Sequence, residues 1–201
     1  MRLRPDLELV AGLVPEGSRV LDLGCGDGEL LAELIERRGC TGWGVELSEE
    51  GFHACLARGV PVVQGDLDRG LDEVSEDEVD VVVLSETIQA LHRPALALRE
   101  LRRVAERGIV SLPNFGYWRL RAWLLARGRM PVSAELPYAW HETPNIHLCT
   151  LRDFEDLLRD ERLRVARRIP LDERHEPASG AAAGRGANLL AAGAIYVLER
   201  G

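Results

Sequence analysis

Short apolar runs alternate with amphipathic segments up to residue 112, and this pattern predicts strands that alternate with helices. The most continuous apolar run, residues 79–84, is typical of a central strand that is covered on both faces. The alternation predicts a doubly wound, mostly parallel α/β sheet with right-handed crossovers. The predicted strands are residues 19–23, 41–46, 60–66, 79–84 and 108–112. One helix is predicted over 7–14, a second from the first glycine-rich loop to about residue 38, and a third after Ser48, which can cap it. A fourth helix is predicted to begin at Pro94, with Leu98, Leu101 and Val104 on one face.

The pattern changes towards the end of the chain. Thr150 and Asp153 have the spacing of a capping box, which predicts a helix over residues 151–159. Strands at about 163–169 and 193–199 flank a link rich in Gly and Ala that we expect to be mobile. These strands predict a terminal antiparallel hairpin that closes the parallel sheet. A chain of 201 residues is expected to fold as a single domain, 1–201.

Residues 20–28 join the first strand to a helix through alternate glycines, which let the backbone turn sharply and approach a ligand. The dinucleotide fingerprint G-x-G-x-x-G would require a glycine where this chain has Glu29. Asp27 and Glu29 in the first helical turn disfavour a phosphate there and favour a cation. S-adenosylmethionine, which carries a sulfonium and an ammonium group but no phosphate, fits this loop. The residues of the repeated spacing are Asp22, Gly24, Gly26 and Gly28.

Further polar residues follow predicted strands at the same edge of the sheet. Glu46 ends the second strand, where a carboxylate can accept hydrogen bonds from both ribose hydroxyls. NAD-binding folds share that position, so Glu46 alone does not discriminate between the two nucleotides. Asp66 follows the third strand and Ser85 follows the fourth. Ligands of doubly wound sheets bind beyond the carboxyl ends of the strands, so we expect these side chains to surround one site.

Composition excludes several classes of protein. The net charge of −8 argues against a nucleic-acid partner and against an anionic membrane, because both require a basic protein surface. The four cysteines lack zinc spacing, so we expect free thiols and no metal. The sequence begins without the apolar core of a signal peptide, and its longest uncharged run, 186–198, is too short to span a bilayer. We therefore expect a cytoplasmic protein.

Residues 111–150 hold most of the aromatic residues and follow the fifth predicted strand, so they can cover the mouth of the site. Six motifs across the chain closely resemble the methionine biosynthesis protein MetW family of bacteria, over about residues 5–199. They are LDLGCGDG at 21–28, QGDLD at 64–68, LSETIQAL at 84–91, LPNFGYWR at 112–119, GRMPVS at 128–133 and LPYxWxxTPNIHLCT at 136–150. The first motif also resembles motif I of class I S-adenosylmethionine-dependent methyltransferases.

The resemblance implies a seven-stranded methyltransferase-like fold with a family-specific insert at about 113–150. It also implies S-adenosylmethionine or S-adenosylhomocysteine as the cofactor and homoserine O-acetyltransferase as a partner whose activity the protein supports. One departure is Glu86, where a glutamine is expected. The expected cofactor-binding residues are Asp22, Leu23, Gly24, Cys25, Gly26, Gly28, Glu46, Leu47, Gly65, Asp66, Leu67 and Ser85.

The insert has three open interpretations: a lid, a substrate pocket or a docking face for a partner. Its aromatic residues also fit a small satellite core, and its histidines also fit a purely structural role. His141 and His147 are candidate general bases, followed by Glu142 and His92. The residues expected at a substrate or partner surface are Asn114, Tyr117, Trp118, Arg119, Arg129, Tyr138, His141, Asn145 and His147.

The alternative function is a stand-alone S-adenosylmethionine-dependent methyltransferase that acts on a small molecule, with the insert as its acceptor lid. Whether methyl transfer occurs at all stays open at this point. An NAD-dependent oxidoreductase is disfavoured because Glu29 replaces the third glycine of its fingerprint.

Overall fold

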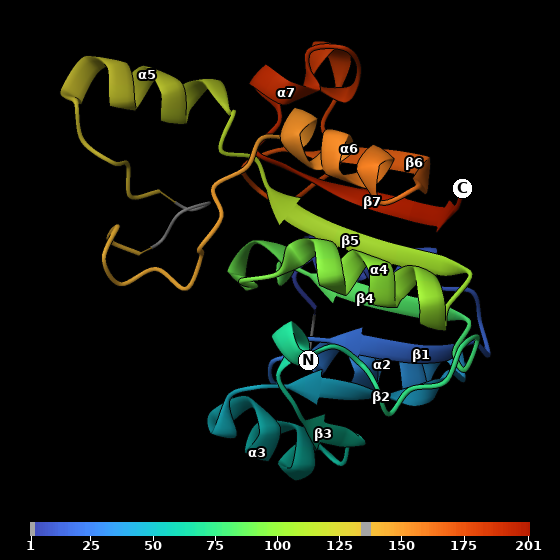
Figure 1. Ribbon diagram of the computed structural model, residues 1–201. Coiled ribbons are helices and arrows are strands. Elements are labelled where there is room, and N and C mark those ends of the chain that lie inside the picture. Colours follow the sequence, from blue (N-terminus) through green and yellow to red (C-terminus); the bar gives the residue numbers. More distant parts are fainter. Residues whose placement is uncertain (1–2, 134–137) are drawn as a thin grey trace.

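The computed structural model describes residues 3–133 and 138–201. Its centre is a seven-stranded sheet in the order β3-β2-β1-β4-β5-β7-β6 (Figure 1). The first five strands are parallel, whereas β7 is antiparallel to both β5 and β6. This confirms the predicted mostly parallel sheet with a C-terminal antiparallel hairpin. The strands are β1 (Arg19–Leu23), β2 (Thr41–Glu46), β3 (Val62–Gln64), β4 (Val81–Ser85), β5 (Arg107–Pro113), β6 (Leu163–Leu171) and β7 (Gly193–Arg200).

Helices cover both faces of the sheet (Figure 1). Successive residues of β4 pack on opposite faces, as the two-residue period of a strand requires. Val81 and Val83 pack in a core cluster with residues of α1 and α2, whereas Val82 and Leu84 pack in a cluster with residues of α4 and α6. The helices are α1 (Pro5–Leu13), α2 (Glu29–Arg38), α3 (Glu49–Arg58), α4 (Pro94–Val104), α5 (Trp118–Arg127), α6 (Leu151–Asp160) and α7 (Ala187–Leu190), with 3-10 turns at Leu67–Arg69, Ile88–Ala90 and Gly180–Ala183. Within the described residues, no helix has the length and apolar character that crossing a membrane requires.

Local capping chemistry fixes several of the helix ends. Ser48 accepts a hydrogen bond from the backbone N–H of Gly51 at the start of α3. Thr150 and Asp153 form the complete capping box before α6. Gly39 ends α2 in the left-handed conformation. The predicted boundaries of these helices are therefore confirmed to within one or two residues.

Two segments contain elements that the sequence did not predict. The link at 177–188 contains the 3-10 turn at Gly180–Ala183 and the start of α7, and its expected mobility stays a prediction. Residues 118–127, for which no element was predicted, form helix α5, which extends away from the sheet (Figure 1). Of its residues only Leu120 is buried, so α5 lacks the apolar stripe that marks a helix packed on a core.

Candidate functional site

Three glycines shape the loop between β1 and α2, and each has a positive φ, at 74° for Gly24, 57° for Gly26 and 76° for Gly28. A Cβ at Gly24 would lie 2.6 Å from the Thr87 side chain, and one at Gly28 would lie 2.9 Å from the Cys55 Sγ atom. A Cβ at Gly26 would meet no atom within 4 Å. Gly24 and Gly28 are therefore required for packing, whereas Gly26 leaves open space beside the loop.

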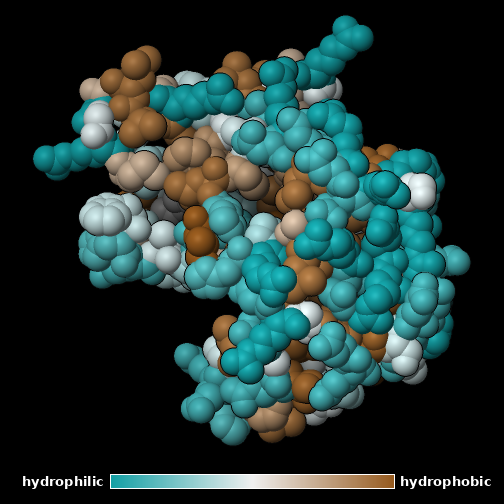
Figure 2. Space-filling view, viewed as in Figure 1, coloured by the Kyte–Doolittle hydropathy of each residue, from teal (hydrophilic) through white to brown (hydrophobic). Residues whose placement is uncertain are grey.

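That open space belongs to a cavity of about 270 Å³ at the carboxyl ends of β1 and β4, which we call the nucleotide cavity. Figure 2 shows the molecule hollowed on this side of the sheet. Asp22, Gly24, Cys25, Gly26 and Ser85 line it, as expected from the sequence. Its other lining residues are Arg4, Leu7, Asp27, Glu29, Leu30 and Glu86. Carboxylates thus outnumber cations around the cavity, which favours a positively charged ligand.

Asp22 is the most deeply placed carboxylate of the nucleotide cavity, with 2% of its surface exposed. Burial, and then the charge of Glu46, raises the pKa of Asp22 to about 7. Within the described part of the chain, no group donates a hydrogen bond to its side chain. A donor or a cation in the cavity would relieve the cost of ionising this buried carboxylate.

This raised pKa predicts a pH-dependent stability. The unfolded chain releases the Asp22 proton near pH 4, whereas the folded protein retains it up to about pH 7. Folding therefore becomes less favourable as pH rises between these values, by about 2 kcal/mol from pH 5 to pH 7. We expect the Asp22→Asn variant to lack this decline when urea unfolding is followed across the range. Parallel profiles for the variant and the wild-type protein would contradict the assignment.

Glu46 holds the loop through both of its carboxylate oxygens. Its Oε2 accepts from the backbone N–H of Gly26 at 2.9 Å, and its Oε1 accepts from that of Ser48 at 2.9 Å. Each oxygen retains capacity for a second hydrogen bond. Glu46 therefore positions the glycine loop in addition to the ribose-binding role that the sequence predicts.

A side chain of the glycine loop accepts a hydrogen bond from a backbone N–H group at the N-terminus of α2. The Oδ1 atom of Asp27 accepts from the backbone N–H of Glu29 at 3.2 Å. Its Oδ2 atom pairs with Arg58 at 2.6 Å, so the Asp27 charge is compensated. The prediction that this helix end disfavours a phosphate is consistent with this geometry, because a carboxylate already stands there.

The other expected cofactor residues, Glu46 included, do not line the nucleotide cavity. Leu23 is buried in the sheet and Leu47 is exposed beyond β2. Gly65 donates its N–H to the Glu46 carbonyl at 3.0 Å, which places the end of β3 beside that of β2. Asp66 accepts from the Asp68 N–H at 3.0 Å and begins the 3-10 turn that contains Leu67.

The insert divides into a buried anchor and an exposed part. Asn114 and Tyr117, which were expected at a substrate or partner surface, are buried. The Asn114 Nδ2 atom donates to the carbonyls of Ala191 at 2.8 Å and Asn188 at 3.2 Å, and Oδ1 accepts from the Gly116 N–H at 2.9 Å. These bonds fasten the insert to α7, so Asn114 supports the segment from inside. Five of the residues expected at a substrate or partner surface are exposed: Trp118, Arg119, Arg129, Tyr138 and His141. Asn145 is half-buried, and residues 134–137 of the insert lie outside the described residues.

Removal of the Asn114 amide should destabilise the protein. Asn114→Ala leaves buried carbonyls and a buried N–H without partners, and we expect the free energy of unfolding to fall by about 2–3 kcal/mol. Asn145→Ala is the matched control, with an expected change within about 0.5 kcal/mol. Urea denaturation of both variants measures the difference. Equal stability of the two would show that the Asn114 bonds are not needed.

The predicted general bases do not lie at the nucleotide cavity. His141 is exposed, with its Nε2 atom 3.8 Å from Glu142 Oε1, and His92 is exposed as well. His147 is exposed and borders only a small void beside Asn114. None of the three lines the nucleotide cavity.

Four residues that the sequence did not single out lie beside the nucleotide cavity: Arg4, Asp6, Gln89 and His175. They come from α1 and its flank, the turn after β4 and the loop after β6, so no local spacing connects them. Asp6 precedes the predicted first helix, 7–14, and nothing in the sequence indicated that its side chain would be buried.

Comparison with known proteins places the chain among proteins of methionine biosynthesis. The family model described as methionine biosynthesis protein MetW matches residues 4–198. The bifunctional methionine biosynthesis protein MetXA/MetW of Rhodopirellula baltica is 39% identical over 165 residues, which are 78% of this chain and 26% of that protein. A ubiquinone biosynthesis O-methyltransferase of Paracidovorax citrulli is 33% identical over 142 residues, 66% of this chain and 59% of the relative. The chain thus spans about a quarter and about three fifths of these two proteins.

Solved structures share the fold. A chain in the complex between the Trm112 methyltransferase activator and a putative methyltransferase of Haloferax volcanii superposes with a TM-score of 0.69 at 18% identity, covering 98% of this chain and 89% of that chain. A SAM-dependent methyltransferase of Thermotoga maritima, a possible histamine N-methyltransferase, gives a TM-score of 0.68 at 19% identity, covering 98% and 88%. At this identity the similarity establishes the methyltransferase-like fold alone.

Proposed function

Because this chain belongs to the methionine biosynthesis protein MetW family, we propose that it is a cytoplasmic partner protein of bacterial methionine biosynthesis. In this proposal it binds S-adenosylmethionine or S-adenosylhomocysteine, and it associates with homoserine O-acetyltransferase and supports that enzyme's activity. The chain forms one methyltransferase-like domain, 1–201, and residues 113–150 are its family-specific insert. The observation that supports nucleotide binding is the open, acidic cavity beside Gly26.

The residues of the nucleotide cavity fit this cofactor. The space left by Gly26 admits a ligand against the backbone, and an ammonium group in the cavity would favour the ionised form of Asp22, whose pKa burial raises to about 7. Glu46 stands behind the loop with lone pairs available to ribose hydroxyls. When bound, S-adenosylmethionine supplies an activated methyl group on a sulfonium. The chain's own residues bind and orient it, and the carboxylates favour its positive charges.

Glu46 should contribute measurably to nucleotide affinity. Glu46→Ala removes a charged acceptor and releases the Gly26 N–H, so we expect binding of S-adenosylhomocysteine to weaken by about 1.5–3 kcal/mol. Glu49→Ala, an acid in the first turn of α3, is the control that should leave affinity unchanged. Isothermal titration calorimetry measures both. Unchanged affinity in Glu46→Ala would place the ribose elsewhere.

The association part of the proposal is supported by the surface of α5, which we call the α5 surface and define as Trp118, Trp123, Leu124, Leu125 and Arg127. Arg127 stacks over the Trp123 ring at 3.9 Å. Figure 2 shows apolar side chains gathered where α5 lies in Figure 1. Exposed Trp, Leu and Arg on one projecting helix are typical of an interface rather than of a free surface.

Charge indicates which kind of partner fits the α5 surface. Residues 114–133 contain four arginines and no carboxylate, although the whole chain carries a net charge of −8. A partner with an apolar pocket and an acidic rim would complement it. The Rhodopirellula baltica relative is named for MetXA and MetW together, which supports a physical connection between the two activities. We assign this surface to homoserine O-acetyltransferase.

We also propose that bound nucleotide regulates the association. S-adenosylmethionine and S-adenosylhomocysteine derive from methionine, the end product, so their concentration would adjust the activity of an early enzyme of the pathway. Such coupling requires that the nucleotide binds the free protein and the complex with different affinity. We expect the dissociation constant of the complex to change on addition of S-adenosylhomocysteine. An equal dissociation constant with and without it would remove this regulatory part and leave the association intact.

The second candidate function is a stand-alone methyltransferase that acts on a small molecule. It is favoured by the similarity to a ubiquinone biosynthesis O-methyltransferase, together with a further cavity beside the nucleotide cavity. This function predicts turnover of S-adenosylmethionine to S-adenosylhomocysteine when an acceptor is supplied, and loss of that turnover in Glu46→Ala. Absence of turnover over a broad acceptor panel, while the nucleotide still binds, would favour the partner protein.

A further inference from the structure

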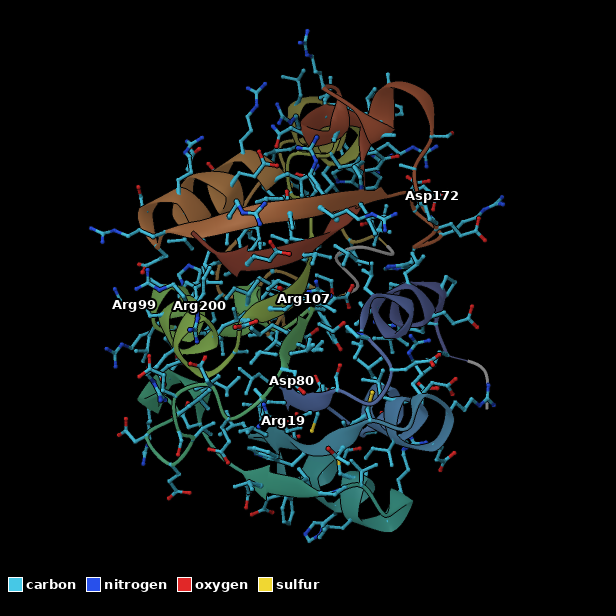
Figure 3. The ribbon with its side chains drawn as sticks, turned by 90° about the vertical axis from the view of Figure 1, so that its right-hand side faces the viewer. Arg19, Asp80, Arg99, Arg107, Asp172 and Arg200 are labelled. Carbon is cyan, nitrogen blue, oxygen red and sulfur yellow. The ribbon has the colours of Figure 1, made fainter. Side chains whose placement is uncertain are left out.

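A second cavity of about 290 Å³ adjoins the nucleotide cavity, and Arg4 and Glu86 line both. It lies at the carboxyl ends of β4 and β5, between α1 and the loop after β6. Figure 3 shows Asp172 at the start of that loop, on the side of the sheet where α1 lies. Tyr138 and Asn145 of the insert also line it, so the insert covers this cavity in part. Its volume is that of a small ligand.

Two buried acceptors in the wall of the second cavity have no donor within the part of the chain that the structure describes. Gln89 is 4% exposed, and its Nε2 atom donates to the Glu86 carbonyl at 2.7 Å, which leaves Oε1 without a partner. Asp6 is 1% exposed; its Oδ2 atom accepts from Arg4 at 2.9 Å, and Oδ1 has no partner among the described residues. Buried acceptors without donors are unfavourable, so the wall favours a ligand that brings N–H groups.

The charge of the second cavity is negative. Asp6, Glu86 and Asp172 line it, and Arg4 is its one lining arginine among the described residues. Arg4 pairs with Asp6 at 2.9 Å and with Glu86 at 3.4 Å, so one cation serves two carboxylates. At the other end of the sheet each of two arginines pairs with one carboxylate: Arg19 with Asp80, and Arg200 with Asp77 (Figure 3 labels Arg19, Asp80 and Arg200).

We propose that the second cavity binds a small molecule through a primary ammonium group, held by Asp6, Gln89 and Glu86. An ammonium group has three N–H donors, and Asp6, Gln89 and Glu86 each contribute an oxygen acceptor to the wall of this cavity. Its single positive charge offsets the excess of carboxylates. This site adjoins the nucleotide cavity and shares Arg4 and Glu86 with it, but the amine is proposed to bind without any nucleotide.

A divalent metal ion is the competing cation. Asp6, Glu86 and His175 each offer a ligand atom, and these atoms lie within 4.8 Å of one another. However, the guanidinium of Arg4 already contacts both carboxylates, and it would repel a doubly charged ion placed between them. An ammonium group carries half that charge and also satisfies the Gln89 amide oxygen, so the geometry favours the amine.

Ligand-observed saturation-transfer NMR tests the site with n-butylamine, its neutral analogue n-butanol, and L-norleucine, all in buffer with EDTA. We expect n-butylamine to bind and n-butanol to bind at least tenfold more weakly. L-norleucine carries the same ammonium group with a carboxylate; whichever of the two amines binds more tightly shows whether the natural ligand is an amino acid or a simple amine. Equal binding of n-butanol, or no amine binding in EDTA, would overturn the proposal.

Variants locate the amine. Asp6→Asn and Gln89→Met are expected to lower n-butylamine affinity at least tenfold, whereas Asp156→Asn, an exposed site on α6, should leave it unchanged. Gln89→Met keeps the charge of the cavity, so it remains informative if Asp6→Asn folds poorly. Gly26→Val, in the nucleotide cavity, should also leave amine affinity unchanged. Unchanged affinity in both cavity variants, or its loss in Gly26→Val, would overturn the assignment.

Discussion

Replacement of Gly26 with valine is expected to abolish nucleotide binding while the protein stays folded. A Cβ at this position meets no protein atom within 4 Å, and Gly26 lines the nucleotide cavity, so we expect the added side chain to enter the space that the ligand would occupy. The valine branches would fill that space against the loop. We expect the affinity for S-adenosylhomocysteine to fall about 1,000-fold, which corresponds to about 4 kcal/mol. Calorimetric titration measures the loss, and circular dichroism should remain close to that of the wild-type protein.

The backbone provides a matched control for this substitution. Gly39 at the end of α2 has a φ of 63°, close to the 57° of Gly26, and its Cβ also meets no atom within 4 Å. Gly39→Val therefore carries a similar conformational cost, about 1–2 kcal/mol, far from the cavity. It should lower stability as Gly26→Val does and leave nucleotide affinity intact. Equal affinities for the two variants would show that the glycine loop is only a structural turn.

The second large effect concerns the α5 surface. Trp123→Ala combined with Leu125→Ala removes a tryptophan that is 38% exposed and a leucine that is 90% exposed. Buried tryptophans dominate the energy of many interfaces, and loss of such an anchor typically costs 2 kcal/mol or more. We expect the double variant to weaken the complex with homoserine O-acetyltransferase about 1,000-fold, measured by surface plasmon resonance. Stability should change little, because neither side chain is buried in the core.

Exposed leucines elsewhere serve as the control for this surface. Leu56 on α3 and Leu189 on α7 are also exposed, and Leu56→Ala with Leu189→Ala should leave the complex unchanged. Nucleotide affinity should be unchanged in both double variants, since none of these residues lines the nucleotide cavity. A complex that tolerates loss of Trp123 and Leu125 would place the docking surface elsewhere on the protein.

The parts of the fold that local chemistry determines could be predicted from the sequence. The capping box of Thr150 and Asp153, the N-cap at Ser48 and the glycine at position 39 each specify a helix end through contacts a few residues apart. The alternation of apolar strands and helices likewise specifies the parallel sheet. Gly26 was predicted to contact the nucleotide from the spacing of the glycines together with Asp22 and the acidic first turn of α2, and this role stays a prediction.

The rest depends on contacts that sequence patterns do not contain. Helix α5 was missed because its apolar residues face outward, and only Leu120 packs on the protein. Asn114 was expected at the surface, but its amide is held by carbonyls of α7, more than seventy residues later in the chain. Asp6, Gln89 and His175 meet at the second cavity from three distant segments. Folding alone brings such residues together.

Support of homoserine O-acetyltransferase is the function that we propose for this protein. Its test is the rate of homoserine acetylation by the cognate enzyme at increasing concentrations of this protein. We predict that the rate rises and saturates, and that the Trp123→Ala/Leu125→Ala variant fails to raise it at the same concentrations. A rate that does not change, with both proteins folded and mixed at micromolar concentrations, would contradict the proposed role and favour the stand-alone methyltransferase.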